Sequence, residues 1–237
     1  MSNTAFLVVI LIVVDSLWKA AANGHSGRLG DYSSSSLLWY IFGAQLASTS
    51  VRFRMIEEIG DEIGNGGIAI AMLRPVSVVG MQLAIALGEG FARVIPGIFG
   101  GALVTLFMAG APPSWTGVAL GTAVAVPLGL AVNIVFATAF AGIAFWLMDA
   151  RSSWFLYQKL VFLPGGMLIP LELFPNTLAH ACMALPFAAM VYVPGRIMSG
   201  HLDISLVLEQ VIWLAVALGC AVAIFARGQK RLEVTGG

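Results

Sequence analysis

The sequence is dominated by long apolar runs that short polar stretches separate. Six runs are candidate membrane spans, at about residues 4–22, 36–51, 78–108, 117–148, 154–174 and 204–226. A spanning helix needs about 20 mostly apolar residues, because the hydrocarbon core of a bilayer is about 30 Å thick. Backbone groups that face lipid must be hydrogen-bonded within their own segment, so helices are expected. The pattern predicts an all-α membrane protein with six transmembrane helices, in a single domain over residues 1–237.

Two of these runs contain residues that interrupt helices. Residues 78–108 include Pro96, where we expect a break or a kink. The stretch FLPGGMLIPLELFPNTLAH holds three prolines and a glycine pair, which makes one straight helix improbable. We therefore expect the fifth span to end there. Residues of about 164–200 are predicted to form short re-entrant or half-helical pieces on the outer side of the membrane.

The basic residues favour one orientation across the membrane. With a cytoplasmic N-terminus, eight of the 12 Lys and Arg residues fall inside, three fall outside and Arg93 is intramembrane. Basic residues concentrate in cytoplasmic loops. Six spans return the chain to its starting side, so both termini are expected to be cytoplasmic. Residues 52–77 then form the first cytoplasmic loop.

Composition supports a membrane protein and narrows its function. Hydrophobic residues make up 59% of the chain and charged residues 10%, against about 45–50% and about 25% in soluble domains. The formal net charge is zero, so nothing points to nucleic acid. The N-terminal apolar run lacks the basic start of a signal peptide and is interpreted as the first span. No phosphate-binding G-x-x-x-x-G-K-[ST] loop is present.

Much of the charge gathers in one stretch, Arg52–Gly80. Ile56, Ile59 and Ile63 recur at three- and four-residue steps, which predicts a helix with one apolar stripe. The other faces carry Glu57, Glu58, Asp61 and Glu62. GNGG at 64–67 is expected to end the helix. The helix lies either on lipid headgroups or against a soluble protein, and its acidic face favours the protein because inner leaflets are usually anionic.

Several polar residues lie within or beside the apolar runs. Glu89 and Arg93 are four apart and can form an ion pair, either with a structural or gating role or in contact with substrate. Asn133 is expected to hydrogen-bond between helices, with a polar substrate site as the alternative. Glu172 and Glu209, near outer ends of runs, are candidates for lining an exit path.

Aromatic residues cluster near the predicted membrane edges. They are Trp39, Tyr40, Trp115, Trp146, Trp154 and Tyr192. Tryptophan and tyrosine are enriched where membrane meets water, so these residues predict an aromatic belt.

The order of several stretches resembles the permease subunit of a type-2 ABC exporter, within the two-permease family of bacterial multidrug- or antibiotic-type exporters. These stretches are SLWKA, LGDYSSSSLLWY, EIGNGGIAIAMLRPVS, GIAFW and PGGMLIPLELFPNTLAHACMALPFAAMVYVPGRIMSG. The resemblance covers about residues 16–230. Family members usually carry an amphipathic elbow helix before the first span. Here only three residues precede the first apolar run, which departs from that pattern.

The resemblance implies a cytoplasmic ATPase dimer that binds ATP and Mg, with no cofactor or metal on this chain. It implies a coupling helix between the second and third spans. The residues expected to couple to the ATPase are Arg52, Arg54, Ile56, Glu57, Glu58, Ile59, Asp61, Glu62, Ile63 and Arg74. A second permease, related but different, is expected to complete the substrate path in the lipid of a bacterial inner membrane. The expected cargo is hydrophobic or amphipathic, such as a drug, peptide or lipid.

Two other function classes stay open from the sequence. A secondary transporter or channel subunit would need an inverted repeat or ion-coupling carboxylates in broken helices. An intramembrane enzyme would need a catalytic pair or a set of metal ligands at membrane depth. The sequence shows neither feature. A copurifying ATPase would separate an ABC permease from both classes.

Overall fold

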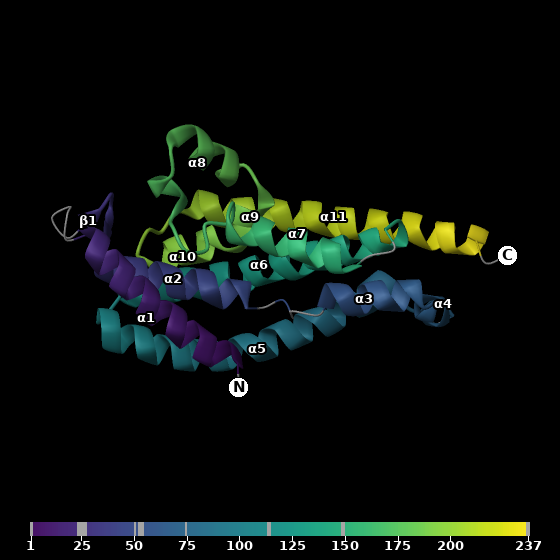
Figure 1. The fold of residues 1–237 in the computed structure, drawn as a ribbon, viewed down its shortest axis with the longest axis horizontal. Helices are drawn as coiled ribbons and strands as arrows, with labels where there is room; N and C mark the ends of the chain where they lie inside the picture. Colours follow the sequence, from purple (N-terminus) through teal and green to yellow (C-terminus); the bar gives the residue numbers. More distant parts are fainter. Residues whose placement is uncertain are drawn as a thin grey trace.

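The computed structural model describes residues 2–22, 28–49, 51, 55–73, 75–112, 115–147 and 150–235, which are almost entirely helical (Figure 1). The main helices of the bundle are α1 (Ser2–Ala22), which crosses it obliquely, and α2 (Ser34–Ser48), α5 (Val78–Ala109), α6 (Trp115–Gly142), α7 (Ala150–Phe162) and α11 (Ile204–Thr235), which follow its long axis more closely. Successive members of this set run in opposite directions. A small antiparallel hairpin, β1 (Arg28–Leu29) and β2 (Tyr32–Ser33), closes one end.

Three helices of the described residues are long and apolar enough to cross a membrane, at Val78–Ala109, Thr116–Phe145 and Ile204–Arg231. They coincide with the third, fourth and sixth predicted spans. Only 17% of the most apolar window of the first and of the last is buried inside the protein. Large side chains stand on these open faces, and Phe107 is 90% exposed. Such faces suit lipid or another membrane subunit.

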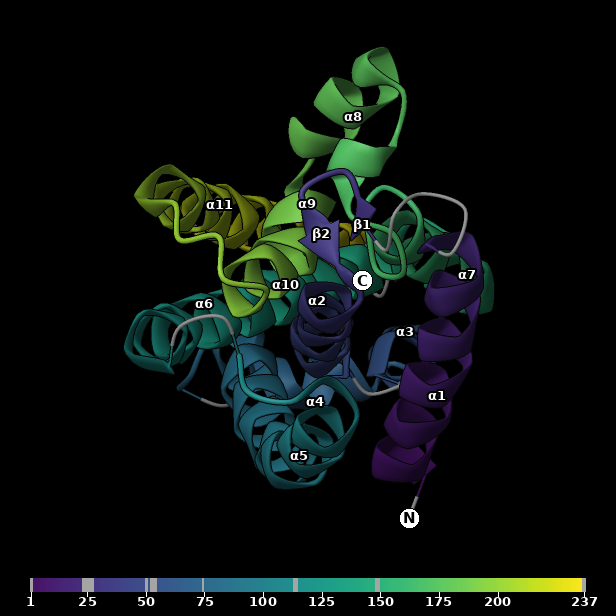
Figure 2. The ribbon, with the colours of Figure 1, turned by 90° about the vertical axis from the view of Figure 1, so that its left-hand side faces the viewer.

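α2 lies at the centre of the bundle (Figure 2). Every residue from Ser36 to Ala47 is buried. The helix begins with a capping box, in which the side chain of Ser33 accepts from the backbone N–H of Ser36 and the Ser36 hydroxyl accepts from that of Ser33. Its 15 residues span about 22 Å at about 1.5 Å per residue. Because protein surrounds α2, it does not need the length of a lipid-facing helix.

Between α7 and α11 the chain folds into short helices at the hairpin end. These are the 3₁₀ helix η2 (Leu171–Leu173) and the α-helices α8 (Asn176–Met183), α9 (Pro186–Met190) and α10 (Tyr192–Met198). α8 projects from the bundle, whereas α9 and α10 turn back into it and are buried (Figure 2). α10 packs against α2. The contact is so close that a Cβ atom on Gly43 would lie 2.7 Å from the carbonyl oxygen of Pro194.

Prolines are expected to interrupt two of the predicted spans. α5 is one continuous helix through Pro96, so the expected break is absent, and the helix changes direction along its length (Figure 1). Membrane helices tolerate proline when surrounding groups satisfy the freed carbonyl. α7 ends at Phe162, within the stretch where the fifth span is expected to end, and residues 163–174 do not continue it as an α-helix. The reason is local: Pro164 follows, and Gly166 adopts a φ of 68°, a left-handed turn conformation that favours glycine.

The expected aromatic belt is wrong for most of its members. Trp39, Tyr40, Trp154 and Tyr192 are buried inside the protein, and Trp146 is exposed. The side chain of Trp115 lies outside the described residues. Protein carbonyls accept from two of the buried rings: Trp39 Nε1 donates to Gly110 O at 3.3 Å, and the Tyr40 hydroxyl donates to Gly166 O at 2.5 Å. These aromatics hold helices and loops together and do not face the membrane surface.

Candidate functional site

The predicted acidic helix is α3 (Met55–Gly64), at the end of the bundle opposite the hairpin (Figure 1). Ile56, Ile59 and Ile63 are buried. α3 packs against α6, α7 and the 3₁₀ helix η1 (Ile143–Phe145). The predicted apolar stripe is therefore confirmed for these three residues. Through this stripe, α3 packs against α6 and α7 of the bundle.

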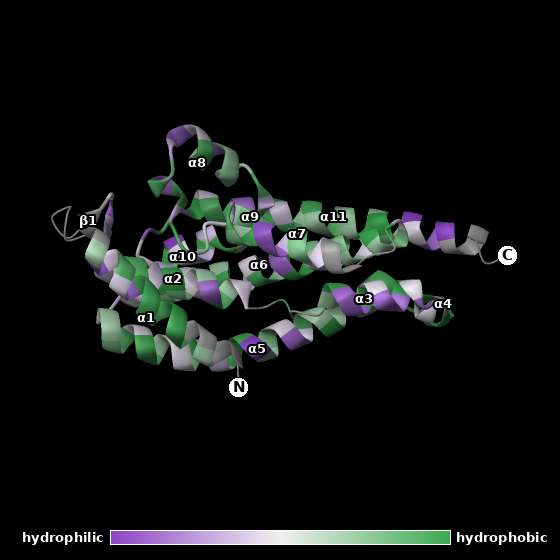
Figure 3. Cartoon of the chain, in the orientation of Figure 1, coloured by the Kyte–Doolittle hydropathy of each residue, from purple (hydrophilic) through white to green (hydrophobic). Residues whose placement is uncertain are grey.

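The acidic residues of α3 occupy its other faces. Asp61 and Glu62 are exposed, and Glu57 and Glu58 are half-buried. Hydrophilic residues gather on α3 and on the last turns of α11, while the middle of the bundle is mostly hydrophobic (Figure 3). One hydrogen bond leads from this face into the bundle, because Gln82 Nε2 of α5 donates to Glu62 Oε2 at 2.8 Å.

The glycine-rich turn ends α3 as predicted. Asn65 N donates to Asp61 O at 2.8 Å, and Gly66 adopts a φ of 74°. α4 (Gly67–Met72) follows. Ile70 within this helix and Leu73 directly after it are exposed. Of the residues expected to couple to an ATPase, Arg52, Arg54 and Arg74 lie outside the described residues.

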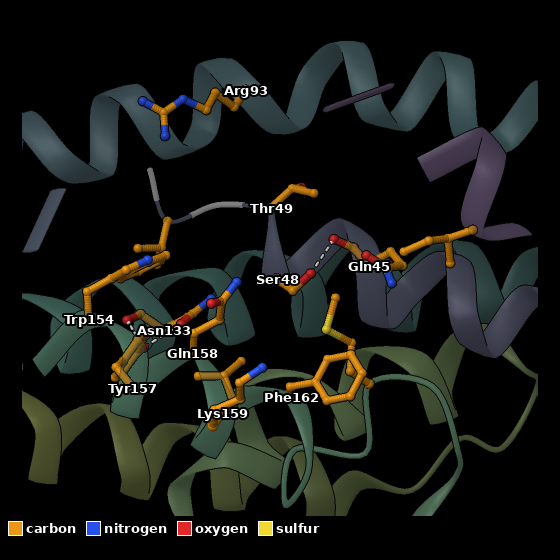
Figure 4. A pocket seen from close by; sticks show the side chains of 14 residues that line it. Gln45, Ser48, Thr49, Arg93, Asn133, Trp154, Tyr157, Gln158, Lys159 and Phe162 are labelled. Atoms are coloured by element: carbon orange, nitrogen blue, oxygen red, sulfur yellow. Dashed lines mark hydrogen bonds between the residues drawn. The ribbon is translucent and has the colours of Figure 1, made fainter. Parts of the chain in front are cut away.

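A cavity of about 500 Å³ lies between α1, α2, α5, α6 and α7. Two of the candidate path residues line it from opposite sides, Arg93 of α5 and Asn133 of α6 (Figure 4). The full lining is Ile10, Gln45, Ser48, Thr49, Val51, Arg93, Asn133, Trp154, Tyr157, Gln158, Lys159, Val161, Phe162 and Met167. Most of the lining surface is apolar, as in many ligand pockets, and polar side chains stand on several sides of it.

Asn133 joins three helices beside the cavity. Its Nδ2 donates to Ala47 O of α2 at 3.3 Å, and the Tyr157 hydroxyl of α7 donates to Asn133 Oδ1 at 2.5 Å. The expected hydrogen bond between helices is thus confirmed. The same residue also lines the cavity, so the two sequence interpretations are compatible.

Glu89 and Arg93 form the predicted ion pair, with Arg93 Nη2 3.0 Å from Glu89 Oε2. The two residues face different spaces. Arg93 lines the large cavity, whereas Glu89 lines a smaller one of about 160 Å³ together with Glu58 and Glu62 of α3. The pair therefore lies between the acidic helix and the large cavity.

Glu172 belongs to a separate cluster at the hairpin end, which sequence reasoning did not assemble. Its Oε1 accepts from the hydroxyls of Tyr32 at 3.1 Å and Tyr192 at 2.6 Å, and it forms an ion pair with Arg196. Burial raises the pKa of Tyr32 to about 12, so this hydroxyl keeps its proton at neutral pH. The i,i+4 spacing of Tyr192 and Arg196 was the one available sequence signal. The cluster ties the hairpin to the short helices between α7 and α11.

Glu209, the last candidate path residue, is half-buried on α11 and does not line the large cavity. Its neighbour Gln210 is the polar residue of α11 that sequence reasoning missed. Gln210 Nε2 donates to Ala125 O of α6 at 3.0 Å and to Ala189 O of α9 at 2.9 Å. A glutamine within an apolar run was the signal that could have found it.

We expect His201 to make the stability of the hairpin end depend on pH. It is half-buried against the Tyr32 ring, at 5.1 Å between ring centroids. Burial and then the Arg196 charge lower the pKa of His201 from its ordinary 6.5, while Asp31 opposes them. As the pH falls below 6.5, His201 binds a proton in the unfolded chain before it does so in the folded chain. The free energy of unfolding therefore decreases as the pH falls, and it levels off below the pKa of His201 in the folded protein.

We therefore expect the melting temperature to drop on acidification from about pH 7 to about pH 5, the range in which histidine ordinarily titrates. His201→Gln should remove part of this drop, as measured by thermal unfolding in detergent. His180→Gln, at an exposed position on α8, is the control and should keep it. An equal acid-induced drop in wild type and His201→Gln would contradict the assignment.

Comparison with known proteins gives one match. A family model described as "ABC-2 family transporter protein" matches residues 6–236, nearly the whole chain. No curated protein and no solved structure matches this chain.

Proposed function

We propose a function from one premise, which is that this chain belongs to the ABC-2 family of transporter proteins. It moves cargo across the membrane by coupling to a separate cytoplasmic ABC ATPase through α3. The chain is a membrane permease subunit of an ABC transporter. The observation that carries the proposal is the construction of α3. Its isoleucines are buried against the bundle while Asp61 and Glu62 remain exposed, so a partner can bind a helix that is fastened to the permease.

The arrangement of the long helices supports six spans. α1, α2, α5, α6, α7 and α11 pass along the bundle in alternating directions (Figure 1). α3 lies at the same end as the C-terminus. We assign that end, where the C-terminus lies, to the cytoplasm and the hairpin end to the outside. α1 begins near the middle of the bundle and runs toward the hairpin end (Figure 1), so we assign its start to the cytoplasmic side as well.

A chain of contacts connects α3 with the large cavity. Glu62 is hydrogen-bonded to Gln82, near the start of α5, and Glu89 and Arg93 follow on the same helix. In the proposed mechanism ATP and Mg²⁺ bind on the ATPase, whose closure shifts α3 and, through these contacts, α5. The shift changes the space around Arg93 and lets cargo leave toward the outside.

The partners follow from the exposed surfaces. α5 and α11 leave apolar faces open, which lipid and a second permease, related but different, would cover. The cargo would be hydrophobic or amphipathic, and the location a bacterial inner membrane. Family membership favours this reading over a secondary transporter or channel subunit, because ABC transporters are driven by an ATPase partner.

The test is copurification from mild detergent with a coexpressed ABC ATPase, followed by an ATPase assay. A variant with Glu57, Glu58, Asp61 and Glu62 changed to lysine should lose the ATPase while remaining monodisperse. A double variant at the opposite end, Asp31→Lys with Asp203→Lys, should retain it. Capture of the ATPase by the lysine variant at the wild-type level would exclude the acidic face as the docking site.

A further inference from the structure

The cavity between α1, α2, α5, α6 and α7 has the size of a small-molecule site. Its volume of about 500 Å³ falls within the roughly 300–1,000 Å³ of pockets that hold drug-sized ligands. Side chains such as Ile10, Val161, Phe162 and Met167 give it apolar walls. A ligand that fills it would therefore have an apolar part of about one short chain.

The charged groups of this cavity are of one sign. Arg93 and Lys159 line it, and no carboxylate stands among its described lining residues. Glu89, the ion-pair partner of Arg93, faces the smaller cavity instead. The Arg93 side chain is 25% exposed, and Lys159 is exposed. Charged side chains at membrane depth are costly and generally mark functional sites. Arginine also binds carboxylates and phosphates in a two-point geometry.

Gln45 gives an independent indication of a ligand. It lies on α2, lines the cavity and is 1% exposed. Neither its amide nitrogen nor its amide oxygen has a hydrogen-bond partner among the described residues. Buried polar groups are nearly always hydrogen-bonded, as the amide nitrogen of Gln210 is. A headgroup with acceptor oxygens would give the Gln45 amide the partner that the protein does not supply.

We propose that this cavity binds a single-chain amphiphile with an acidic headgroup. The headgroup oxygens accept hydrogen bonds from Lys159 and the Gln45 amide, and the chain lies along the apolar walls. The volume matches one short chain with its headgroup more closely than the two long chains of a membrane phospholipid. The inference rests on the proposed function, in which this amphiphile is the class of cargo.

Binding can be tested without the ATPase, so that failure here leaves the coupling proposal untouched. The purified chain is placed in phosphatidylcholine nanodiscs and labelled with a photoreactive twelve-carbon carboxylic acid. A quaternary ammonium probe with the same chain serves as the comparison. We expect the acid to label peptides of α2 and α7 and the cationic probe to label them at least about tenfold less, a difference of about 1.4 kcal/mol.

Three variants test the residues. Lys159→Gln and Gln45→Leu should each weaken labelling by the acid, whereas Lys230→Gln, at an exposed position near the end of α11, should not change it. Gln45→Leu should also raise the melting temperature of the ligand-free protein, because it removes a buried amide without a partner. Gln210→Leu is the matched control and should lower it.

Three results would overturn the proposal. The first is equal labelling by the acidic and cationic probes. The second is full labelling in both Lys159→Gln and Gln45→Leu. The third is displacement of the acid by phosphatidylglycerol added to the nanodisc, which would identify the occupant as a membrane phospholipid.

Discussion

Replacing Gly195 with leucine is expected to prevent the bundle from folding, at a cost of at least about 3 kcal/mol, the upper part of the range for overpacked sites. A Cβ atom at this position would lie 2.8 Å from the carbonyl oxygen of Tyr40 and 2.9 Å from its ring. Both α2 and α10 are buried here, so neither backbone can move aside. The close approach holds the re-entrant segment against the central helix.

The measurement is unfolding in detergent, by heat or by increasing amounts of a denaturing detergent. Gly219→Leu is the matched control, because an added Cβ there meets no atom within 4 Å and the residue is exposed on α11. Leucine also favours helix over glycine by roughly 0.5–1 kcal/mol, so this variant should be neutral or more stable. A Gly195→Leu protein that unfolds at the wild-type midpoint would show that α10 can separate from α2.

The sequence predicted features that depend on neighbours along the chain. The apolar stripe of α3, its termination at GNGG and the Glu89–Arg93 pair all follow from three- and four-residue spacing, and the structure has each of them. Hydropathy predicted the long helices α5, α6 and α11, because a long apolar run is likewise a property of residues that are neighbours in the sequence.

Hydropathy could not separate residues that face lipid from residues that face protein. α2 is buried on every side, yet its sequence contains the polar Gln45 and, next to each other, Trp39 and Tyr40. By position in the chain these aromatics suit a membrane edge, but their polar groups are held by Gly110 and Gly166, far along the sequence. Only the packing of segments that are distant in the sequence decides whether such a residue lies at a membrane edge or inside the protein.

The polar clusters were out of reach for a related reason. Tyr32 and Glu172 are 140 positions apart and meet because the hairpin and the re-entrant segment share one end of the bundle. The large cavity likewise needs residues from five helices. No periodicity relates such residues, so the sequence could name Glu172, Arg93 and Asn133 as candidates but not assemble their sites.

Placing a carboxylate in the apolar stripe of α3 should have the second large effect. Ile56→Asp puts a charge at a side chain that is 0% exposed. An uncompensated buried charge lowers the stability of the fold by about 3–5 kcal/mol. α3 can expose this charge to water only by separating from α6 and α7. We expect faster amide hydrogen exchange in α3, a lower melting temperature and loss of the copurifying ATPase.

The comparison with Asp61→Ala decides what the two faces of α3 do. Asp61 is exposed, so its removal should leave hydrogen exchange and the melting temperature unchanged while weakening ATPase capture. If the stripe only seats the helix and the acids only dock the partner, Ile56→Asp disturbs both measurements and Asp61→Ala disturbs capture alone. Unchanged exchange in Ile56→Asp would mean that other contacts hold α3, and an Asp61→Ala protein as unstable as Ile56→Asp would mean that the acidic face is structural. Either result removes the argument that α3 is built to carry force between a soluble partner and the membrane helices.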